Sequence, residues 1–321
     1  MNFLGIDTSA YTTSLAVVNE HGLIWEARRV LDVPPGETGL AQSAAFFQHV
    51  QNLPQLVQTI PSELWQDLGG VGVSMKPRPQ EGSYMPVFTA GYAVAAGIAS
   101  ARGVTLFETT HQEGHVAAGI YSCDLSSNLR VGLAAHISGG TTELLLVEKE
   151  SPGSFKIEIL GGTTDLHAGQ FVDRVGVLLG LPFPAGPALE KLAQQARPGA
   201  ESLLPSSVKG FDVSFSGVET AARRLLEQGT PPADVARAVE GCVARTMSKL
   251  IMAGIEQTGL GEILVVGGVA ANKYIRSEIV RRLNNKVLSR AALFWAEPNW
   301  SRDNAIGVAL LMREKLSVTR K

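Results

Sequence analysis

The fold class follows from one stretch near the start of the chain, Phe3-Leu-Gly-Ile-Asp7-Thr-Ser-Ala-Tyr-Thr12-Thr-Ser-Leu-Ala-Val-Val18. Its two apolar ends are each typical of a buried strand, and the small polar residues between them are typical of a tight turn. A third strand, Leu23–Arg28, follows and completes a meander. The acid and hydroxyl groups at the tip suit contact with a phosphate or its metal, and ordinary turn chemistry explains them equally well.

The same design recurs in the middle of the chain. Val131-Gly-Leu-Ala-Ala-His-Ile137 is a predicted strand, Ser138-Gly-Gly-Thr-Thr142 a polar turn and Glu143-Leu-Leu-Leu-Val147 the returning strand. The N–H groups of Gly139 and Gly140 can approach an anion where any Cβ would intrude. Two strand–turn–strand units, each leading a lobe, predict an internal duplication around a nucleotide-binding cleft.

The stretch His111-Gln-Glu-Gly-His115 concentrates metal-binding chemistry. It follows a predicted strand, Gly103–Phe107, and ligands at such a strand-to-helix turn face the region where open α/β sheets bind ligands. Histidines at i and i+4 share one helix face and can bind one divalent metal. In the metalloprotease signature the glutamate directly follows the first histidine, whereas Glu113 follows by two positions, which disfavours a peptidase. An unrelated pair of helix histidines is the equally weighted alternative.

Composition limits the class of protein. The chain has 321 residues, of which 45% are hydrophobic and 18% charged, and this predicts a globular protein of two lobes. The net charge of −2 gives no general attraction to nucleic acid, so any RNA contact must come from local patches. The two cysteines form no disulfide framework. Without a basic leader or a membrane-length apolar run, we expect a cytoplasmic protein with no membrane partner.

Two late segments complete the list of candidate sites. The predicted strand Glu262–Val266 runs into Gly267-Gly-Val-Ala-Ala-Asn272 and a helix, an arrangement against which an adenine or ribose can lie, or simply a close-packed turn. A closing helix is predicted from Asp303 to Lys315. Asp303 at its start is either a helix cap or a third metal ligand.

Together these motifs resemble the TsaD/Gcp family of tRNA threonylcarbamoyladenosine synthases, once described as sialoglycoprotein endopeptidases. The resemblance covers nearly the whole chain. Its carriers are Gly5-Ile-Asp7-Thr-Ser9, His111 to His115, Ser138-Gly-Gly140, Asp173, Gly186, Phe215-Ser-Gly217, Gly267 to Asn272 and Asp303-Asn304. It implies an α/β, two-lobed actin/hexokinase-like ATPase fold, with duplicated ribonuclease-H-like lobes around a nucleotide cleft.

The expected domains follow from this fold. Residues 1–108 form the N-terminal lobe, and a closing helix over 304–321 packs back on it. Residues 109–303 form the C-terminal lobe, which carries the metal and nucleotide motifs and a helical insertion over about 165–258.

The resemblance implies that His111, His115 and Asp303 bind a metal. It also implies a set of residues that contact an adenine nucleotide or threonylcarbamoyl-adenylate: Ser138, Gly139, Gly140, Asp173, Gly186, Gly267, Gly268 and Asn272. His136 stands where some relatives have a tyrosine ligand, so it is either a fourth metal ligand or a packed strand histidine. With it the site is nitrogen-rich and suits zinc or iron rather than magnesium.

Several positions depart from the family pattern. Asp7 replaces the usual glutamate, Lys76–Gly82 replaces a Gly-Pro-Gly loop, and Leu166 replaces the second of two paired aspartates that begin at Asp165. Loss of that acid removes a charge that could bind metal or orient the attacking amine, and His167 can stand in as a base near neutral pH. We therefore expect Asp173 and His167 to be the catalytic residues of a divergent paralogue with weak activity on ordinary tRNA.

The implied activity is metal-dependent transfer of a threonylcarbamoyl group from its adenylate to N6 of a tRNA adenosine. The implied partners are tRNA, the accessory proteins of that pathway and a second copy of the chain. Two alternatives stay open: a non-catalytic nucleotide-binding partner of a true synthase, and a small-molecule carbamoyltransferase or kinase of the same superfamily.

Overall fold

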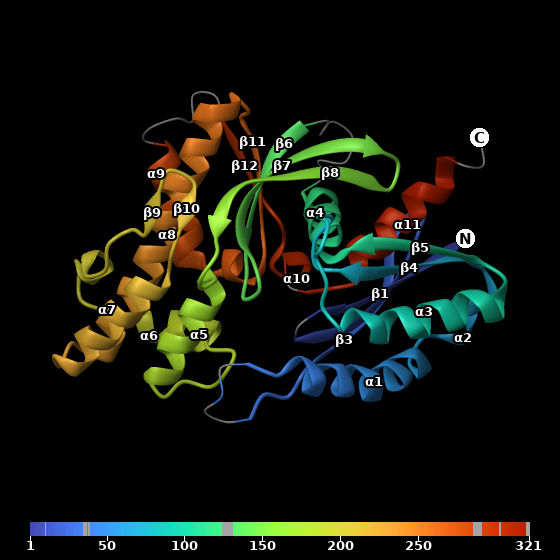
Figure 1. Cartoon of the computed structure of the whole chain (residues 1–321), viewed down its shortest axis with the longest axis horizontal. Helices are drawn as coiled ribbons and strands as arrows, with labels where there is room; N and C mark the ends of the chain where they lie inside the picture. Colours follow the sequence, from blue (N-terminus) through green and yellow to red (C-terminus); the bar gives the residue numbers. More distant parts are fainter. Residues whose placement is uncertain are drawn as a thin grey trace.

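The computed structural model describes residues 1–9, 11–34, 37, 39–123, 131–284, 291–301 and 303–318. Its first sheet has the strand order β3-β2-β1-β4-β5 (Figure 1). The antiparallel meander is confirmed as β1 (Asn2–Ser9), β2 (Thr12–Asn19) and β3 (Gly22–Val30). On the other side of β1 the sheet continues with the parallel strands β4 (Leu68–Lys76) and β5 (Thr105–Thr110).

The second sheet repeats this plan. The antiparallel strands are β6 (Val131–Ile137), β7 (Thr142–Ser151) and β8 (Ser154–Thr163), and β11 (Glu262–Val266) and β12 (Ala292–Trp295) extend the sheet in parallel from β6. The order β12-β11-β6-β7-β8 corresponds strand for strand to β5-β4-β1-β2-β3. The predicted duplication is therefore confirmed.

Two short strands lengthen the second sheet at its β8 edge. They are β9 (Val208–Lys209) and β10 (Asp212–Val213), of which β10 pairs in parallel with β8. Both lie inside the segment predicted as a helical insertion.

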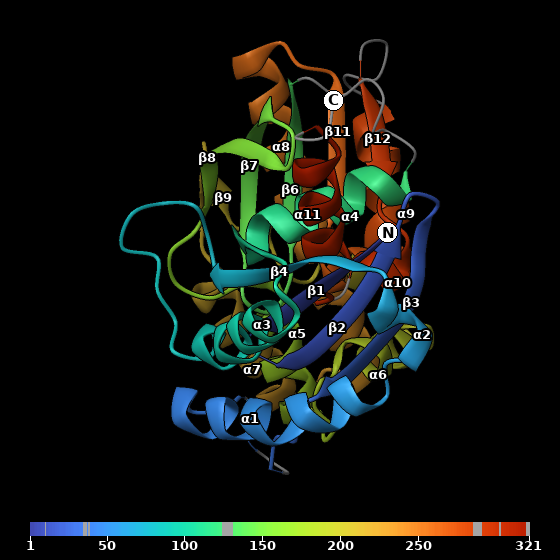
Figure 2. The same cartoon turned by 90° about the vertical axis from the view of Figure 1, so that its right-hand side faces the viewer.

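Two helices lie between the sheets, as Figures 1 and 2 show: α4 (His111–Ser122) and α11 (Ile306–Val318). The apolar side of α11 packs on β1 and β2, and α4 packs on β11 and β6. The two helices touch at their backbones, because a Cβ added to Gly307 would lie 1.8 Å from the carbonyl oxygen of Gly114. Gly114 stands between the two histidines of the motif, so this contact fixes α11 against the proposed metal ligands.

The outer faces of both sheets are covered by helices. On the first sheet these are α1 (Gln42–Gln58) and α3 (Phe88–Arg102). The short helix α2 (Ser62–Gln66) lies between α1 and β4 in the chain. On the second they are α5 (Ala168–Leu178), α6 (Gly186–Ala193), α7 (Ser216–Glu227), α8 (Pro232–Thr258) and α9 (Lys273–Asn284), with short 3-10 turns at Ala200–Ser202 and Gly268–Ala271. Their apolar sides form the largest core of the molecule. No helix among the described residues is both long and apolar enough to cross a bilayer.

The closing helix starts later than the sequence predicts. It begins at Ile306 rather than Asp303, because the side-chain Oδ1 of Asn304 accepts the N–H of Ile306 at 2.9 Å and caps it. Residues 319–321 of the predicted helix lie outside the described residues. A short helix, α10 (Pro298–Ser301), precedes it in the chain. Asp303 thus stands in the connection between two helices and is not part of α11.

Candidate metal centre

The histidine motif begins α4 through a capping box. The N–H of Glu113 donates to Thr110 Oγ1 at 3.2 Å, and Glu113 Oε2 accepts the N–H of Thr110 at 3.1 Å and the hydroxyl of Thr109 at 3.0 Å. These reciprocal bonds satisfy the free N–H groups of the first turn. The glutamate of the motif therefore fixes the start of the helix.

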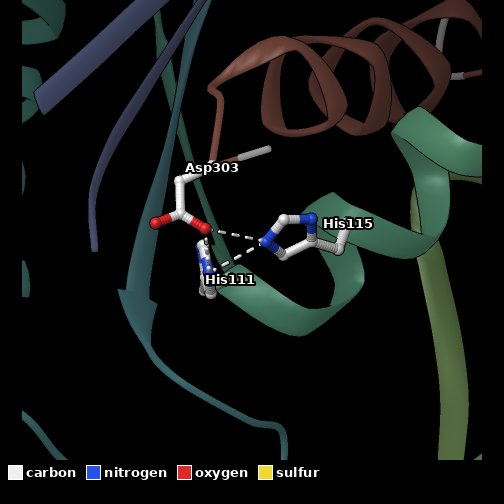
Figure 3. A group of neighbouring side chains, drawn as sticks. All are labelled: His111, His115 and Asp303. Carbon is white, nitrogen blue, oxygen red and sulfur yellow. Dashed lines mark hydrogen bonds and ion pairs between the residues drawn. The ribbon is translucent and has the colours of Figure 1, made fainter. Parts of the chain in front are cut away.

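Three side chains converge between the sheets (Figure 3). His111 Nε2 lies 3.1 Å from His115 Nε2, and Asp303 Oδ1 lies 3.3 Å from His115 Nε2 and 3.6 Å from His111 Nε2. Ligands held at about 2 Å around a tetrahedral ion are separated by about 3.3 Å. Within the described ranges this is the one group of three potential ligand residues close enough to share a metal. The donor set and its spacing fit a divalent ion.

A buried carboxylate supports His111 from the other side. Asp7, at the end of β1, is fully buried, and its Oδ1 lies 3.0 Å from His111 Nδ1 and accepts the hydroxyl of Ser74 at 2.5 Å. Burial opposes the charged form of His111, but the charges of Asp7 and Asp303 and hydrogen bonds to both raise its pKa to about 10. Negative charge on both sides of this imidazole therefore favours a positive charge there.

His136 lies next to this group on β6. Its ring centroid is 4.6 Å from that of His115, and it is buried with no hydrogen-bond partner for either ring nitrogen among the described residues. His115 Nδ1 also lacks a partner there. Burial, followed by the charges of His115 and His111, holds the pKa of His136 well below its usual value. Buried polar atoms without a partner need an explanation, and a metal ligand is one.

The glycines predicted to face a nucleotide differ in their surroundings. Apart from chain neighbours and, for Gly186 and Gly268, the backbone of their own helical turn, no atom of the described residues lies within 4 Å of a Cβ added to Gly139, Gly140, Gly186 or Gly268, so their backbones border open space on that side. Gly267 has φ +102°, and a Cβ there would lie 2.4 Å from the carbonyl oxygen of Ile137. Gly267 is therefore required by close packing against β6, while the other four can be approached by a ligand. Ser138 closes its own turn by accepting the N–H of Thr141 at 3.1 Å.

Asn272 is engaged within the fold. Its Oδ1 accepts the N–H of Ile275 at 2.8 Å and caps α9, and its Nδ2 donates to Glu240 Oε1 at 2.7 Å. Glu240 is fully buried and pairs with Arg237 at 2.7 Å. The side chain of Asn272 thus positions the turn that contains Gly268, a role that was not foreseen from the sequence.

Asp173 lies on α5 with one oxygen bound to the next loop. Its Oδ1 accepts the N–H of Ala185 at 2.7 Å, and burial raises its pKa to about 6 despite hydrogen bonds from the backbone of Ala185 and Gly186. Burial and, to a smaller extent, the charge of Asp173 raise the pKa of Tyr11 in the first lobe. The ring centroid of Tyr11 lies 5.7 Å from that of Phe183. Asp173 therefore stands where the tip of the first hairpin reaches the second lobe.

The altered acidic pair has a structural explanation. Leu166 is only 3% exposed and packs in the core of the second lobe. Asp165 accepts the hydroxyls of Ser214 and Ser216, each at 2.5 Å, and the N–H of Phe215 at 3.2 Å, so it fixes the start of α7. Neither residue belongs to the group of His111, His115 and Asp303. His167 follows them, is half-buried, and keeps Nδ1 without a partner among the described residues.

Comparison with known proteins decides the family. The sequence model of the family described as "tRNA N6-adenosine threonylcarbamoyltransferase" (TsaD) matches residues 36–310. The chain belongs to the TsaD family. The predicted membership is thereby confirmed.

Solved structures similar to this TsaD-family chain confirm its fold. HypF of T. kodakarensis has 15% sequence identity and a TM-score of 0.63 over 99% of this chain, which spans about half (48%) of the HypF chain. Component A of (R)-2-hydroxyglutaryl-CoA dehydratase from Acidaminococcus fermentans has 14% identity and a TM-score of 0.58, with 99% of each chain covered. ROK hexokinase from Thermus thermophilus has 17% identity and a TM-score of 0.50, with 100% of each covered. At such identities the likeness concerns the fold, which is the predicted two-lobed actin/hexokinase-like ATPase fold.

Proposed function

We propose that this protein transfers a threonylcarbamoyl group from threonylcarbamoyl-adenylate to the N6 amine of a tRNA adenosine, using one divalent metal ion. Membership of the TsaD family supports the reaction class. The observation that carries the proposal is the convergence of His111, His115 and Asp303, whose ligand atoms lie within 4.8 Å of one another.

The metal in this proposal is zinc or iron. Two imidazoles and one carboxylate, with His136 as a fourth ligand, form a nitrogen-rich set that suits these ions better than magnesium. When bound, the ion supplies positive charge that stabilises negative charge developing on a phosphate or carbonyl oxygen. Asp7 accepts from His111 Nδ1 and keeps Nε2 turned toward Asp303.

The donor binds, in this proposal, across the residues that border open space. Its phosphate lies against the turn Ser138-Gly139-Gly140, where the side on which a Cβ would stand at Gly139 and Gly140 is open. Its adenosine lies along the turn from Gly267 to Asn272, with Gly268 as the closest approach. Asp173 and Gly186 complete the contacts at the nucleoside end.

The transfer needs one base. The N6 amine attacks the carbamoyl carbon, a C–N bond forms, and the bond from that carbon to the phosphate oxygen breaks, so that AMP leaves and one proton is released. His167 is our candidate to accept that proton, because its Nδ1 has no partner among the described residues and burial lowers its pKa, which keeps it neutral near pH 7. Asp173 lies six positions further along α5, about 9 Å along the helix axis, and therefore contributes at the nucleoside end.

The proposal includes partners and a location. The acceptor is tRNA, bound through local patches since the chain has a net charge of −2. Accessory proteins of the threonylcarbamoyladenosine pathway and a second copy of the chain are the proposed protein partners, in the cytoplasm.

The altered loop Lys76–Gly82 and the altered pair Asp165-Leu166 favour a second candidate function. Leu166 is buried and Asp165 is held by α7, so the charge pattern on which the family reaction depends is changed. A nucleotide-binding partner of a true synthase, or a carbamoyltransferase or kinase that acts on a small molecule, would retain nucleotide binding without transfer to tRNA.

One experiment separates these functions. Metal-loaded protein is incubated with threonylcarbamoyl-adenylate and unmodified tRNA, with and without the accessory proteins, and digested tRNA is analysed for modified adenosine. The proposal predicts slow product formation that His167→Ala abolishes. Adenylate binding without any product supports the second candidate, and unchanged turnover in His167→Ala removes His167 from the mechanism.

A further inference from the structure

The loop that follows β4 is held in one conformation by several hydrogen bonds. The carbonyl oxygen of Pro77 accepts the N–H of Gln112 at 3.0 Å, which ties the loop to the first turn of α4. Ser83 Oγ accepts the N–H of Arg78 at 3.1 Å, and Lys76 Nζ donates to the carbonyl oxygen of Pro79 at 3.2 Å. Two prolines flank Arg78 and restrict the backbone further. The loop therefore presents Arg78 in a defined direction.

Arg78 reaches from the first lobe to the second. Its Nη2 lies 2.5 Å from Oε1 of Glu143 on β7, and Glu143 Oε2 accepts Nε2 of Gln112 at 2.9 Å. The Glu143 side chain is 5% exposed and that of Arg78 31% exposed. Gln112 thus holds the carboxylate, and the carboxylate holds one edge of the guanidinium.

The remaining donors of Arg78 are not used within the described part of the chain. Nη1 has no acceptor among the described residues, and Nε is buried without one. A guanidinium offers five N–H donors in a rigid plane and binds oxyanions through two parallel bonds. Arg78 is therefore oriented by Glu143, and the terminal N–H groups of Nη1 and Nη2, rather than the buried Nε, are the donors left for an anion.

The partner of Arg78 places the guanidinium near the turn that is proposed to bind the phosphate. This partner, Glu143, lies opposite His136 across β6 and β7, and Thr142 Oγ1, next to Glu143, accepts the N–H of Ala168 at the start of α5 at 2.8 Å. The start of α5 packs on the Ser138–Gly140 turn, since a Cβ added to Gly169 would lie 2.6 Å from Gly139 Cα. Through Glu143, Arg78 is thus held near the Ser138–Gly140 turn and the N-terminus of α5, where the helix dipole favours an anion.

We propose that Arg78 is a specificity-determining residue that binds the 5′-phosphate of the adenylate from across the two lobes. The inference rests on the proposed function, since it assumes that an adenylate is the ligand. A guanidinium on the stiff Lys76–Ser83 loop then supplies the phosphate contact. Glu143 pairs with one part of the guanidinium and competes with the phosphate for its charge.

The test compares two ligands that differ only in the phosphate. Calorimetry measures the affinities of AMP and adenosine for metal-loaded wild type and for Arg78→Gln. We expect AMP to bind about 10- to 100-fold more weakly to the variant, with adenosine unchanged. Arg78→Lys keeps the charge but not the paired donors, so it should fall between the two. Arg223→Gln, which removes a surface arginine bound to Glu219 at 3.3 Å, is the matched control and should change neither affinity.

Glu143→Gln distinguishes a phosphate contact from a purely structural ion pair. If Arg78 binds the phosphate, this variant keeps or tightens AMP binding, because a competing negative charge is removed. If the pair only joins the lobes, Arg78→Gln and Glu143→Gln weaken AMP and adenosine alike, and this result overturns the proposal.

Two other results have separate meanings. Weaker binding of N-carbamoyl-threonine to Arg78→Gln, with AMP unaffected, assigns Arg78 to a carboxylate and also overturns the proposal. Wild-type protein that binds neither AMP nor adenosine overturns the proposed function together with this inference, whereas equal AMP binding by wild type and Arg78→Gln overturns the inference alone.

Discussion

Oδ1 of Asp7 lies 3.0 Å from Nδ1 of His111, so the first strand of the chain is joined to a helix that starts 104 residues later. Since Nδ1 is occupied by this carboxylate, Nε2 faces His115 and Asp303. Carboxylates in this position fix both the tautomer and the direction of a metal-binding histidine. The first lobe thereby contributes to the proposed metal site, in which His111 and His115 come from α4 and Asp303 from the segment before α11.

Asp7→Asn tests this contribution. The variant keeps the shape of the side chain but loses the charge that favours the metal-bound form of His111, so metal affinity should fall about 10- to 100-fold. Competition with a chelating indicator measures it for zinc and iron. Asp32→Asn, at an exposed acid on the same lobe, is the control and should bind metal as the wild type does.

His136→Leu should stabilise the metal-free protein against unfolding and weaken the binding of metal. Without metal, the substitution removes two buried nitrogens that lack partners among the described residues, and the free energy of unfolding should rise by about 1–3 kcal/mol. With metal, loss of a fourth ligand should weaken binding at least about tenfold. Urea unfolding of both states measures the pair of effects. Equal metal affinity in variant and wild type would leave His136 as a packed strand histidine.

Gly307→Ala tests the contact that brings Asp303 to the histidines. The new methyl group would lie 1.8 Å from the carbonyl oxygen of Gly114, so α4 and α11 must separate. We expect a loss of about 1–3 kcal/mol of stability, together with weaker metal binding. Gly97→Ala on α3 is a matched control, because no atom lies within 4 Å of a Cβ there, and it should stabilise by about 0.5–1 kcal/mol. Similar stability changes for both variants would argue against the contact.

The pH dependence of stability should report on Asp173. Burial raises its pKa from 3.8 to about 6, so the native state binds this proton more tightly than the unfolded chain does. The stability of wild type relative to Asp173→Asn should therefore be greatest below about pH 4 and fall by about 3 kcal/mol as the pH rises to about 6.5. Denaturant unfolding at a series of pH values measures the difference. A difference that is constant with pH would contradict the raised pKa.

The fold could be predicted because its signals are local. Each strand–turn–strand unit is contained in fewer than about twenty residues, and two copies in one chain indicate duplication. The strand Ser154–Thr163 was not foreseen, although Phe155 and Ile157 alternate with the charged Lys156 and Glu158 as in a half-buried strand.

The candidate site could be predicted only in part. Spacing along one helix identifies His111 and His115, and the family pattern adds Asp303. The pairings of Asp7 with His111 and of Arg78 with Glu143 join different lobes, and no local pattern indicates them. The same limit applies to Leu166, since burial in the core distinguishes a structural leucine from a lost catalytic acid only once the packing is known.

In our proposal, the His111–His115–Asp303 site holds the metal on which threonylcarbamoyl transfer depends. The most direct test is single-turnover conversion of threonylcarbamoyl-adenylate and unmodified tRNA, followed by mass spectrometry of the digested tRNA. Wild type and Asp303→Ala are each stripped of metal and then given one equivalent of zinc or iron. The account predicts modified adenosine from metal-restored wild type, and none from stripped wild type or from Asp303→Ala. Equal product from stripped and restored wild type, or from Asp303→Ala, would contradict it.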